Sequence, residues 1–591
     1  MSKISIPEIP EGFSLHTENT SHILRASNEA FLNPIQEFNR DLTIACIKTW
    51  SDMLHESSKA RWIASQERKA NGNARGKGKG KKKQQQQQNP LEEDLEQPKK
   101  KIKLDTEAAP GEDLEQPKQK VELDSEATPA PKLRHSFSRR PIVILEPLSA
   151  TGLRAIRFAK EIPHVLRVIA NDLSPAAAAA IRRNIELNKL DLPPPELGPR
   201  PVEVKVVEGD ACTLMYNHRE AANRVDVIDL DPYGTAAPFI DAAVQAVRDN
   251  GILCITCTDL AVLATVNFPE KCFSNYGGVS TKSEYSHEVA LRLVLHTVST
   301  SAARYGRFIE PLLSLSIDFY VRLFIRVKSS PIDVKRAVAK TSIFWICNDC
   351  QSHYGQTIGH VNEKKVDAHG AVNFVFKTQA GPPVSENCPE CKGVLHAAGP
   401  MWSAPLHNQE FVSNVLKHVE NTEAEKAYGT VARMKGMLTV AKDEIPAPFY
   451  FTPAKIAKLF HCVTPSFSDV ASALLHAGFQ VERSHAAPGS IKTNATRGEL
   501  LDIYRCWVKA NPVKDSAPTT PGARLLSKEP NLEANFTRHP QISRYTSGPK
   551  LVRYQEPPPN WGPGTRATGP AKSAPAKRKH IKIEDLEEQE D

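Results

Sequence analysis

The chain has 591 residues, and its 76 lysines and arginines against 68 aspartates and glutamates give a formal net charge of +8. This length is sufficient for the cores of two or more domains. A modest basic excess suits a nucleic-acid partner and equally an ordinary basic protein. The sequence has no apolar run of about 18 residues and its first residues are polar and acidic, so we expect neither a transmembrane helix nor a secretory signal.

The N-terminal part of the chain is predicted to be helical and then to lose its core-forming residues. Apolar side chains recur at helical spacing across residues 22–65, which we assign to an N-terminal helical segment spanning 1–65. Residues 66–135 contain a Gly/Lys run, five consecutive glutamines and a duplicated unit, Glu93–Lys99 and Glu112–Lys118. So few apolar side chains cannot offset the entropy of ordering, and we expect this insertion to be disordered.

Residues 136–335 alternate between short β-branched segments and helical stretches, which is typical of a mainly parallel, doubly wound α/β sheet of the Rossmann-like kind. A Cys-containing module at 336–400, a smaller α/β domain at 401–510 and a disordered tail at 511–591 are expected to follow. The expected strands of the sheet are Pro141–Leu145, Leu166–Ala170, Val202–Val207, Val225–Leu230, Gly251–Thr256 and Ser314–Val327.

Three of these strands end in residues suited to a nucleotide-like ligand. The first runs into the small-residue turn Glu146–Arg154, the second ends at Asp172, and the third ends at Asp210–Ala211. Ligands of doubly wound sheets bind at the carboxyl ends of the strands, where an acid can accept hydrogen bonds from ribose hydroxyls or an adenine amine. Each feature alone is typical of a turn or a helix cap, whereas together they predict a nucleotide site. This domain lacks the glycine-rich dinucleotide fingerprint and the P-loop motif, which argues against an oxidoreductase or an ATPase.

The fourth strand ends in Asp231-Pro232-Tyr233-Gly234. In isolation this tetrapeptide would indicate a turn. Beside a cofactor it suits methylation of an aromatic exocyclic amine, a poor nucleophile whose lone pair is delocalised into the ring. The Asp231 carboxylate and the Pro232 carbonyl can accept the amine hydrogens and turn the lone pair toward a methyl donor. Asp231 can also take the released proton, and Tyr233 offers a face on which an extruded base can stack.

These residues resemble the tRNA (guanine-N2-)-dimethyltransferases, which modify the guanine at tRNA position 26. The resemblance spans about residues 30–510, interrupted by the 66–135 insertion. Its motifs are Phe31–Asp41, Leu148–Arg157, Asp231–Gly234, Thr258–Leu263, Tyr276–Gly278, His287–Arg304, Pro311–Val327, Gly399–Trp402, Ser484–His485 and Ile491–Ala495.

The resemblance implies a transferase that moves two methyl groups in succession from S-adenosyl-L-methionine to one guanine nitrogen of tRNA. It implies that Arg40 and Arg154 contact the methionine part of the cofactor, that Asp172 holds the ribose, and that Asp210 with Ala211 holds the adenine. Asp231 would be catalytic, with Pro232 and Tyr233 beside it. The domain at 401–510 would help to hold the tRNA. Arg483, His485 and Lys492 are candidate phosphate contacts, or else part of a solvated basic surface.

Two Cys-x-x-Cys pairs, Cys347 with Cys350 and Cys388 with Cys391, predict a closed four-thiolate site for a structural Zn²⁺. The 37 residues between the pairs exceed the usual zinc-ribbon spacing, and a redox pair or core cysteines are the alternatives. The other seven cysteines are expected to fill cores.

Basic clusters at Pro98–Leu104 and Lys577–His580 suit nuclear import or nonspecific RNA contacts, so we expect a nuclear protein, with a mitochondrial location as the alternative. Nothing in the sequence indicates an obligate protein partner. Two other functions are compatible with the motifs. One is an amino-methyltransferase of the same fold acting on rRNA, DNA or a glutamine side chain, and the other is a catalytically inactive, zinc-containing RNA-binding protein.

Overall fold

The structure, a computed structural model, describes residues 9–26, 32–75, 137–191, 202–364, 372–514, 517–546 and 551–554. The chain divides into two compact units, one formed by Met1–Leu54 with Arg140–Asp591 and the other by His55–Arg139. In the smaller unit, the His55 and Trp62 rings lie 5.4 and 5.9 Å from the Phe137 ring. Within the described ranges, no helix is both long and apolar enough to cross a membrane.

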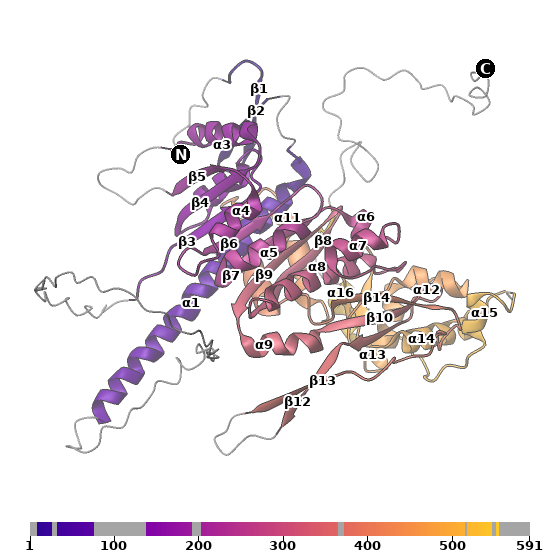
Figure 1. Cartoon of the computed structure of the whole chain (residues 1–591). Helices are drawn as coiled ribbons and strands as arrows, with labels where there is room; N and C mark the ends of the chain where they lie inside the picture. The colour runs from indigo at the N-terminus through magenta and orange to yellow at the C-terminus, as the bar shows by residue number, and fades with distance from the viewer. Residues whose placement is uncertain are drawn as a thin grey trace, which may run out of the picture. The chain divides into compact units, whose positions relative to one another are not determined.

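The larger unit is built on a seven-stranded sheet with the strand order β5-β4-β3-β6-β7-β9-β8 (Figure 1). The strands from β5 to β7 are parallel, whereas β9 runs antiparallel to both β7 and β8. All six residues of the central strand β6 are buried, and its two aspartates, Asp226 and Asp229, form ion pairs with Arg140 and Arg322. The predicted doubly wound, Rossmann-like α/β fold is therefore confirmed. The strands are β3 (Ile142–Glu146), β4 (Val165–Asp172), β5 (Glu203–Glu208), β6 (Val225–Leu230), β7 (Val247–Cys257), β8 (Arg307–Ile317) and β9 (Tyr320–Ser329).

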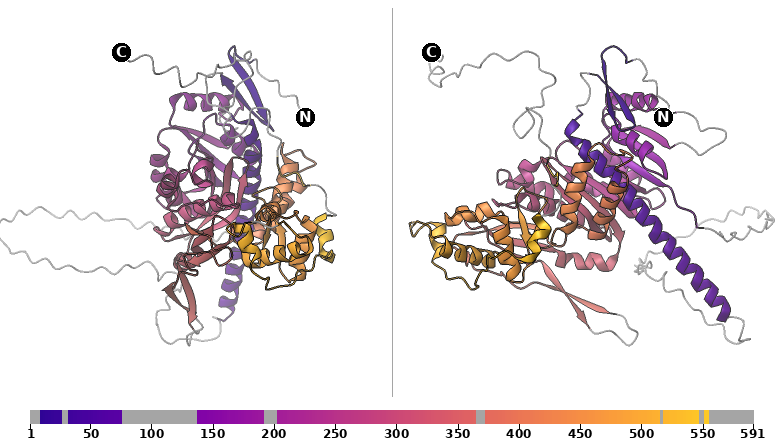
Figure 2. Two further views of the ribbon diagram at one scale, coloured as in Figure 1. Left: turned by 90° about the vertical axis from the view of Figure 1, so that its right-hand side faces the viewer. Right: turned by 180° about the vertical axis from the view of Figure 1, so that it is seen from behind.

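Helices cover both faces of the sheet and create two apolar cores. One core joins the sheet to the start of α1 and to α2, α3, α10 and α11, and the other joins it to α5 and α8. The left view of Figure 2 shows the sheet between these two layers. The bounds are α1 (Glu37–Arg75), α2 (Leu153–Glu161), α3 (Pro175–Leu187), α4 (Ala211–Asn217), α5 (Ala237–Ala246), α6 (Leu260–Leu263), α7 (Pro269–Tyr276), α8 (Ser286–Ala303) and α9 (Pro331–Arg336), with the 3-10 helices η1 (Pro34–Gln36) and η3 (Ala337–Lys340).

The N-terminal segment departs from the sequence expectation. Residues 21–26 form strand β2 (Ser21–Ala26), paired antiparallel with β1 (Phe13–Glu18), where helical spacing predicted a helix. The strand is fixed by a distant helix, since the Asn184 side chain of α3 accepts a hydrogen bond from the Leu24 amide at 2.9 Å. Helix α1 runs to Arg75, so the first ten residues of the predicted disordered insertion are helical. Residues 76–135 of that insertion lie outside the described residues.

The single strand predicted at Ser314–Val327 is a hairpin of β8 and β9. Both strands are almost entirely buried, so no change of pattern marks the turn at Asp318, whose φ is +44°.

Beyond the sheet, a three-stranded antiparallel sheet carries the cysteines, and a bundle of short helices follows. Residues 517–546 were predicted to be disordered, yet Leu525 and Ile542 are fully buried in the third apolar core. The rest of the predicted tail, apart from 511–514 and 551–554, lies outside the described residues. The elements are β10 (Thr341–Cys347), β11 (His353–Thr357), β12 (Gly359–Lys364), β13 (Asn373–Thr378), β14 (Leu395–Trp402), α10 (Gln409–Asn421), α11 (Val431–Asp443), α12 (Pro453–Phe460), α13 (Phe467–His476), β15 (Val481–Arg483), β16 (Ile491–Thr493), α14 (Arg497–Ala510), α15 (Pro521–Leu526), η4 (Pro540–Ile542) and α16 (Ser543–Thr546).

Candidate active site and metal centre

A cavity of about 540 Å³ opens at the carboxyl ends of β3, β4 and β6, next to the start of α1. Its volume lies within the range of about 300–1,000 Å³ that is usual for small-molecule sites. Six of the eight sequence-predicted catalytic and cofactor residues line this one cavity. The lining residues are Leu32, Asn33, Gln36, Arg40, Glu146, Leu148, Ser149, Ala150, Thr151, Leu153, Arg154, Asp172, Asp231, Pro232, Tyr233, Phe239 and Thr258.

The turn from β3 to α2 is held in place by the end of β4. The two Asp172 oxygens accept hydrogen bonds from the Ala150 amide at 2.9 Å and the Ser174 amide at 3.0 Å. Gly152 has a φ of +77°, and a Cβ there would lie 3.0 Å from Ile181 Cγ2. Only glycine allows the turn to pack this closely on α3 without strain. The turn and Asp172 thus form a rigid wall of the cavity.

Asp231 lies in a network of buried charges. Arg154 forms an ion pair with Asp231 through one guanidinium nitrogen, and its other lies 3.4 Å from Asp229 Oδ2. Burial alone would raise the pKa of Asp231, but the charges of Arg154 and Arg322 outweigh burial and hold that pKa below its ordinary value. Asp231 is therefore an ionised hydrogen-bond acceptor at neutral pH.

Glu146 behaves in the opposite way. It is buried at the end of β3, with the Ser149 hydroxyl 2.8 Å from Oε2. Burial, with the nearby charge of Asp229, raises its pKa to about 8. Glu146 and Asp231, two of the carboxylic acids that line this cavity, therefore hold different protonation states at neutral pH, a feature that often marks functional sites.

Arg40 reaches the cavity from α1 and is paired with Glu18 of β1, whose Oε2 lies 2.7 Å from Nε. Burial would raise the pKa of Glu18, but hydrogen bonds from His16 and Arg40 and the charges of Arg40 and Arg157 lower it to about 2. The N-terminal hairpin thus orients Arg40, and no signal near Glu18 in the sequence indicated this partner.

Tyr233 and Pro232 differ sharply in exposure. Pro232 is buried, whereas Tyr233 is 79% exposed at the edge of the cavity. Gly234 has a φ of +90°, and its amide donates to the Thr258 hydroxyl at 2.9 Å. An aromatic ring held in the open by a tight turn is suited to stacking on a nucleobase.

Two predicted residues, Asp210 and Ala211, do not line the cavity. Asp210 is exposed and its Oδ1 caps α4 by accepting from the Thr213 amide at 2.7 Å, while Ala211 is buried. Sequence reasoning also missed Phe239, which lines the cavity from α5. No local pattern singles out that phenylalanine from an ordinary core residue.

Two predicted phosphate contacts are wrong. Lys492 is 1% exposed, and its Nζ lies 3.3 Å from Glu288 and 3.1 Å from Glu444. His485 is also 1% exposed and lies 2.6 Å from Glu444. Both side chains join β16 and the chain beside it to α8 and α11, so neither can reach a phosphate. Arg483 is half-buried and remains a prediction.

The four predicted metal ligands are brought together. Cys347 Sγ lies 3.4 Å from Cys391 Sγ, and Cys350 Sγ lies 3.6 Å from Cys388 Sγ. A disulfide would need about 2.05 Å, whereas a tetrahedral zinc with Zn–S bonds of about 2.3 Å places its sulfurs about 3.8 Å apart. All four thiols are buried and free. Their geometry fits a four-thiolate metal centre.

A second group of possible ligands, His407, Glu444 and His485, fits an ion-pair network better than a metal. The Ser316 amide donates to His485 Nε2 and the Ser314 amide to His407 Nδ1, so in each ring the other nitrogen, which faces Glu444, is the one placed to donate. Because the ammonium of Lys492 also pairs with Glu444, a metal ion would meet repulsion here.

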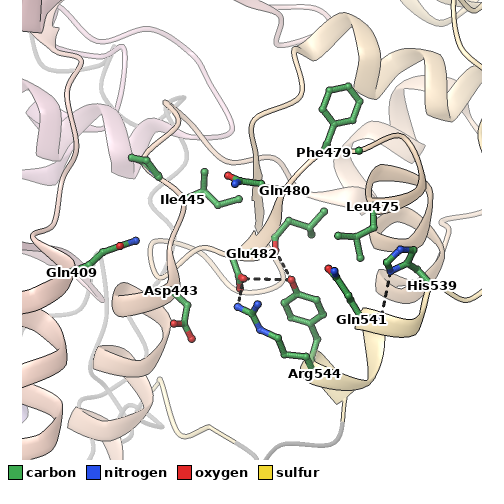
Figure 3. Close-up of a pocket in the computed structure, with 14 residues that line it drawn as sticks. Gln409, Asp443, Ile445, Leu475, Phe479, Gln480, Glu482, His539, Gln541 and Arg544 are labelled. Atoms are coloured by element: carbon green, nitrogen blue, oxygen red, sulfur yellow. Dashed lines mark hydrogen bonds and ion pairs between the residues drawn. The ribbon is translucent and has the colours of Figure 1, made fainter.

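Another cavity, of about 470 Å³, lies beside β15 and η4 (Figure 3). Glu482 and Arg544 pair with each other across its floor, and burial with the charge of Asp443 raises the pKa of Glu482 to about 7. The side chains of Arg544 and Tyr545 both bond to Glu482, so the charge network at Asp231 is the better candidate for chemistry.

Comparison with known proteins gives a consistent result. The family model described as N2,N2-dimethylguanosine tRNA methyltransferase matches residues 13–505. The chain is 38% identical to the tRNA (guanine(26)-N(2))-dimethyltransferase of Schizosaccharomyces pombe, covering 93% of this chain and 90% of that protein. It is 39% identical to the human enzyme of the same name, covering 93% and 77%. The mitochondrial enzyme of Saccharomyces cerevisiae is 38% identical, with coverages of 94% and 92%. Trm1 from Pyrococcus horikoshii, solved with S-adenosyl-L-methionine, has the same fold, with a TM-score of 0.55, 22% identity and coverages of 83% and 99%.

Proposed function

Because the chain belongs to the N2,N2-dimethylguanosine tRNA methyltransferase family, we propose that it transfers methyl groups from S-adenosyl-L-methionine to the exocyclic N2 amine of guanine 26 in tRNA. The observation that carries this proposal is the position of Asp231. An ionised carboxylate at the end of the central strand lies beside an exposed aromatic ring, in a cavity large enough for the cofactor.

The cavity residues fit S-adenosyl-L-methionine, which when bound supplies an electrophilic methyl group. Arg40 and Arg154 present guanidinium groups for its carboxylate, and the oxygens of Asp172 can accept from its ribose hydroxyls. Asp210 and Ala211 are proposed for the adenine, because the Asn171 side chain donates to Gly209 O at 3.0 Å and ties the end of β5 to the cavity wall.

The chain's own residues would prepare the amine for attack. Asp231 and the Pro232 carbonyl accept the two amine hydrogens and direct the nitrogen lone pair toward the methyl group. The stacked guanine lies on Tyr233, outside the helix of its own RNA. As the new N–C bond forms and the methyl–sulfur bond of the donor breaks, Asp231 would take the proton that the nitrogen releases. Its side chain is 15% exposed, so the proton can pass on to water before the second transfer.

The experiment is incubation with labelled S-adenosyl-L-methionine and, separately, tRNA, rRNA and DNA. We expect label in tRNA alone, and loss of transfer in Asp231→Ala with cofactor and tRNA binding retained. Asp191→Ala, the same change at an exposed aspartate outside the cavity, is the matched control and should keep most of the activity. Label found only in DNA or rRNA, or full activity of Asp231→Ala, would contradict the proposal.

We further propose that the four cysteines hold one structural Zn²⁺. A closed shell of four thiolates leaves no position for water, so the metal would stabilise the fold rather than act in catalysis. The backbone supports the same conclusion, since Arg497 donates to Cys350 O at 3.0 Å and Arg524 to Cys391 O at 2.5 Å, which ties the cysteine loops to α14 and α15.

The domain at 401–510 is proposed to hold tRNA, with Arg483 as the remaining candidate contact. A nuclear location is proposed from the basic clusters at Pro98–Leu104 and Lys577–His580, both outside the described residues. The budding-yeast relative named mitochondrial supports that location as the alternative. Imaging of a fluorescent fusion, with each basic cluster replaced in turn by alanine, distinguishes a nuclear from a mitochondrial location.

A further inference from the structure

Arg322 is a fully buried arginine on β9 that lines neither of the cavities described above, although its charge helps to hold the pKa of Asp231 below its ordinary value. One of its terminal nitrogens donates to Thr256 Oγ1 at 2.8 Å. The other donates to Asp229 Oδ1 at 2.7 Å and to Thr43 Oγ1 at 2.7 Å. A single side chain thus joins β9, β7, β6 and α1 beneath the floor of the active site.

Two of these three contacts lead to Asp231. On the first route, Arg322 holds Asp229, and the other oxygen of Asp229 faces Arg154, which pairs with Asp231. On the second route, Arg322 donates to the Thr256 oxygen, so the Thr256 hydroxyl hydrogen is directed away from Arg322. The hydrogen bond of Thr256 with Asp231 contributes to the lowered pKa of that carboxyl. The third contact, to Thr43, leads to α1 instead.

The charges in this cluster balance only when Arg322 is present. Because Glu146 holds a proton at neutral pH, the ion pairs of the cluster join two carboxyl groups, those of Asp229 and Asp231, to two guanidinium groups, those of Arg154 and Arg322. Without Arg322, two buried carboxylates would compete for Arg154. Asp231 would then ionise less readily, and Arg154 would be drawn toward Asp229 and away from the cavity.

We propose that Arg322 is a positioning residue for methyl transfer, which keeps Asp231 ionised and leaves Arg154 directed at the cofactor. The proposal rests on the function proposed above. It assigns a role in the reaction to a residue that does not touch either substrate.

The test compares two chemically identical changes on either side of the same guanidinium. Thr256→Val removes the hydroxyl that leads to Asp231, and Thr43→Val removes the one that leads to α1. Both threonines are fully buried, and valine preserves their shape. Arg322→Lys keeps the charge but loses the forked geometry, and Arg322→Met loses both. Single-turnover methylation of tRNA is measured from pH 3.5 to 7.5, and S-adenosyl-L-methionine binding is measured separately by calorimetry.

In Arg322→Met we expect the acid limb of the rate profile to move upward by about one pH unit, with a weakened affinity for S-adenosyl-L-methionine. Arg322→Lys should restore part of the acid limb but little of the rate at its plateau. Thr256→Val should move the limb in the same direction by less, whereas Thr43→Val should leave the profile in place while lowering thermal stability.

An unmoved acid limb in both Arg322→Met and Thr256→Val would overturn the proposal, as would equal effects of the two valine substitutions. If Arg322→Met does not fold, the two valine variants decide the question. A wild-type protein that binds the cofactor but methylates no tRNA would contradict the proposed function instead, and cofactor affinity in the Arg322 variants would still test the positioning of Arg154.

Discussion

Glu146→Gln is the substitution whose effect can be worked out most directly from the structure. Burial and the charge of Asp229 raise the pKa of Glu146 from 4.5 to about 8. The folded protein therefore keeps a proton that the unfolded chain loses near pH 4.5, and stability must fall as the pH rises between these two values. Glutamine has the same shape and stays neutral, so the variant lacks this contribution to the pH dependence.

The magnitude follows from the pKa difference of about 3.5, at about 1.4 kcal/mol for each pH unit. Between pH 5.5 and 7.5 the folded state holds the proton and the unfolded state does not. The wild type should lose about 3 kcal/mol of unfolding free energy relative to Glu146→Gln over this window. The side chain is 1% exposed, so solvent screening does not reduce this figure appreciably.

Urea unfolding followed by tryptophan fluorescence at pH 5.5, 6.5 and 7.5 measures this difference. Glu208→Gln, an exposed glutamate at the end of β5, is the control and should show the same pH dependence as the wild type. A difference between wild type and Glu146→Gln that stays constant across the three pH values would refute a protonated, buried Glu146.

Three further outcomes are expected. Lys492→Met should lower the free energy of unfolding by about 3–5 kcal/mol in urea titrations, because it leaves Glu288 and Glu444 as buried carboxylates without their shared cation. An unchanged free energy of unfolding would contradict the buried ion pairs of Lys492. If the exposed ring of Tyr233 acts by stacking, Tyr233→Phe should retain methyl transfer, because phenylalanine keeps the aromatic ring. In steady-state kinetics, Tyr233→Ala should raise KM for tRNA more than it lowers kcat. Elemental analysis should find one zinc per chain in the wild type and less in Cys350→Ser, whose melting temperature should no longer respond to a chelator. A wild-type protein that contains no metal and is as stable with a chelator as without one would exclude the zinc centre.

The sequence predicted the sheet and the centre of the site because both depend on local patterns. Val225–Leu230 is buried along its whole length and is apolar apart from Asp226 and Asp229, and Asp231 follows directly at the carboxyl end of that strand. The position of Asp172 could be predicted for the same reason. The paired cysteines come together because each pair already shares one turn of chain.

The features that could not be predicted depend on contacts between distant parts of the chain. Lys492 has the composition of a surface residue, and only the partners supplied by α8 and α11 make it a buried cation. Strand β2 forms where the sequence indicates a helix, because α3 supplies hydrogen bonds to its edge. Arg322 occupies one position of a buried strand, and nothing in its neighbours along the chain indicates the carboxylate that it pairs with.

The most direct test of the proposed function is mass spectrometry of nucleosides from unmodified tRNA after incubation with the protein and S-adenosyl-L-methionine. We predict N2,N2-dimethylguanosine, mapped to position 26 and absent when Asp231→Ala replaces the wild type. A tRNA that gains no methylated guanosine from the folded, cofactor-bound protein, or gains it equally from Asp231→Ala, would contradict the assignment of Asp231 as the group that prepares the guanine amine for methylation.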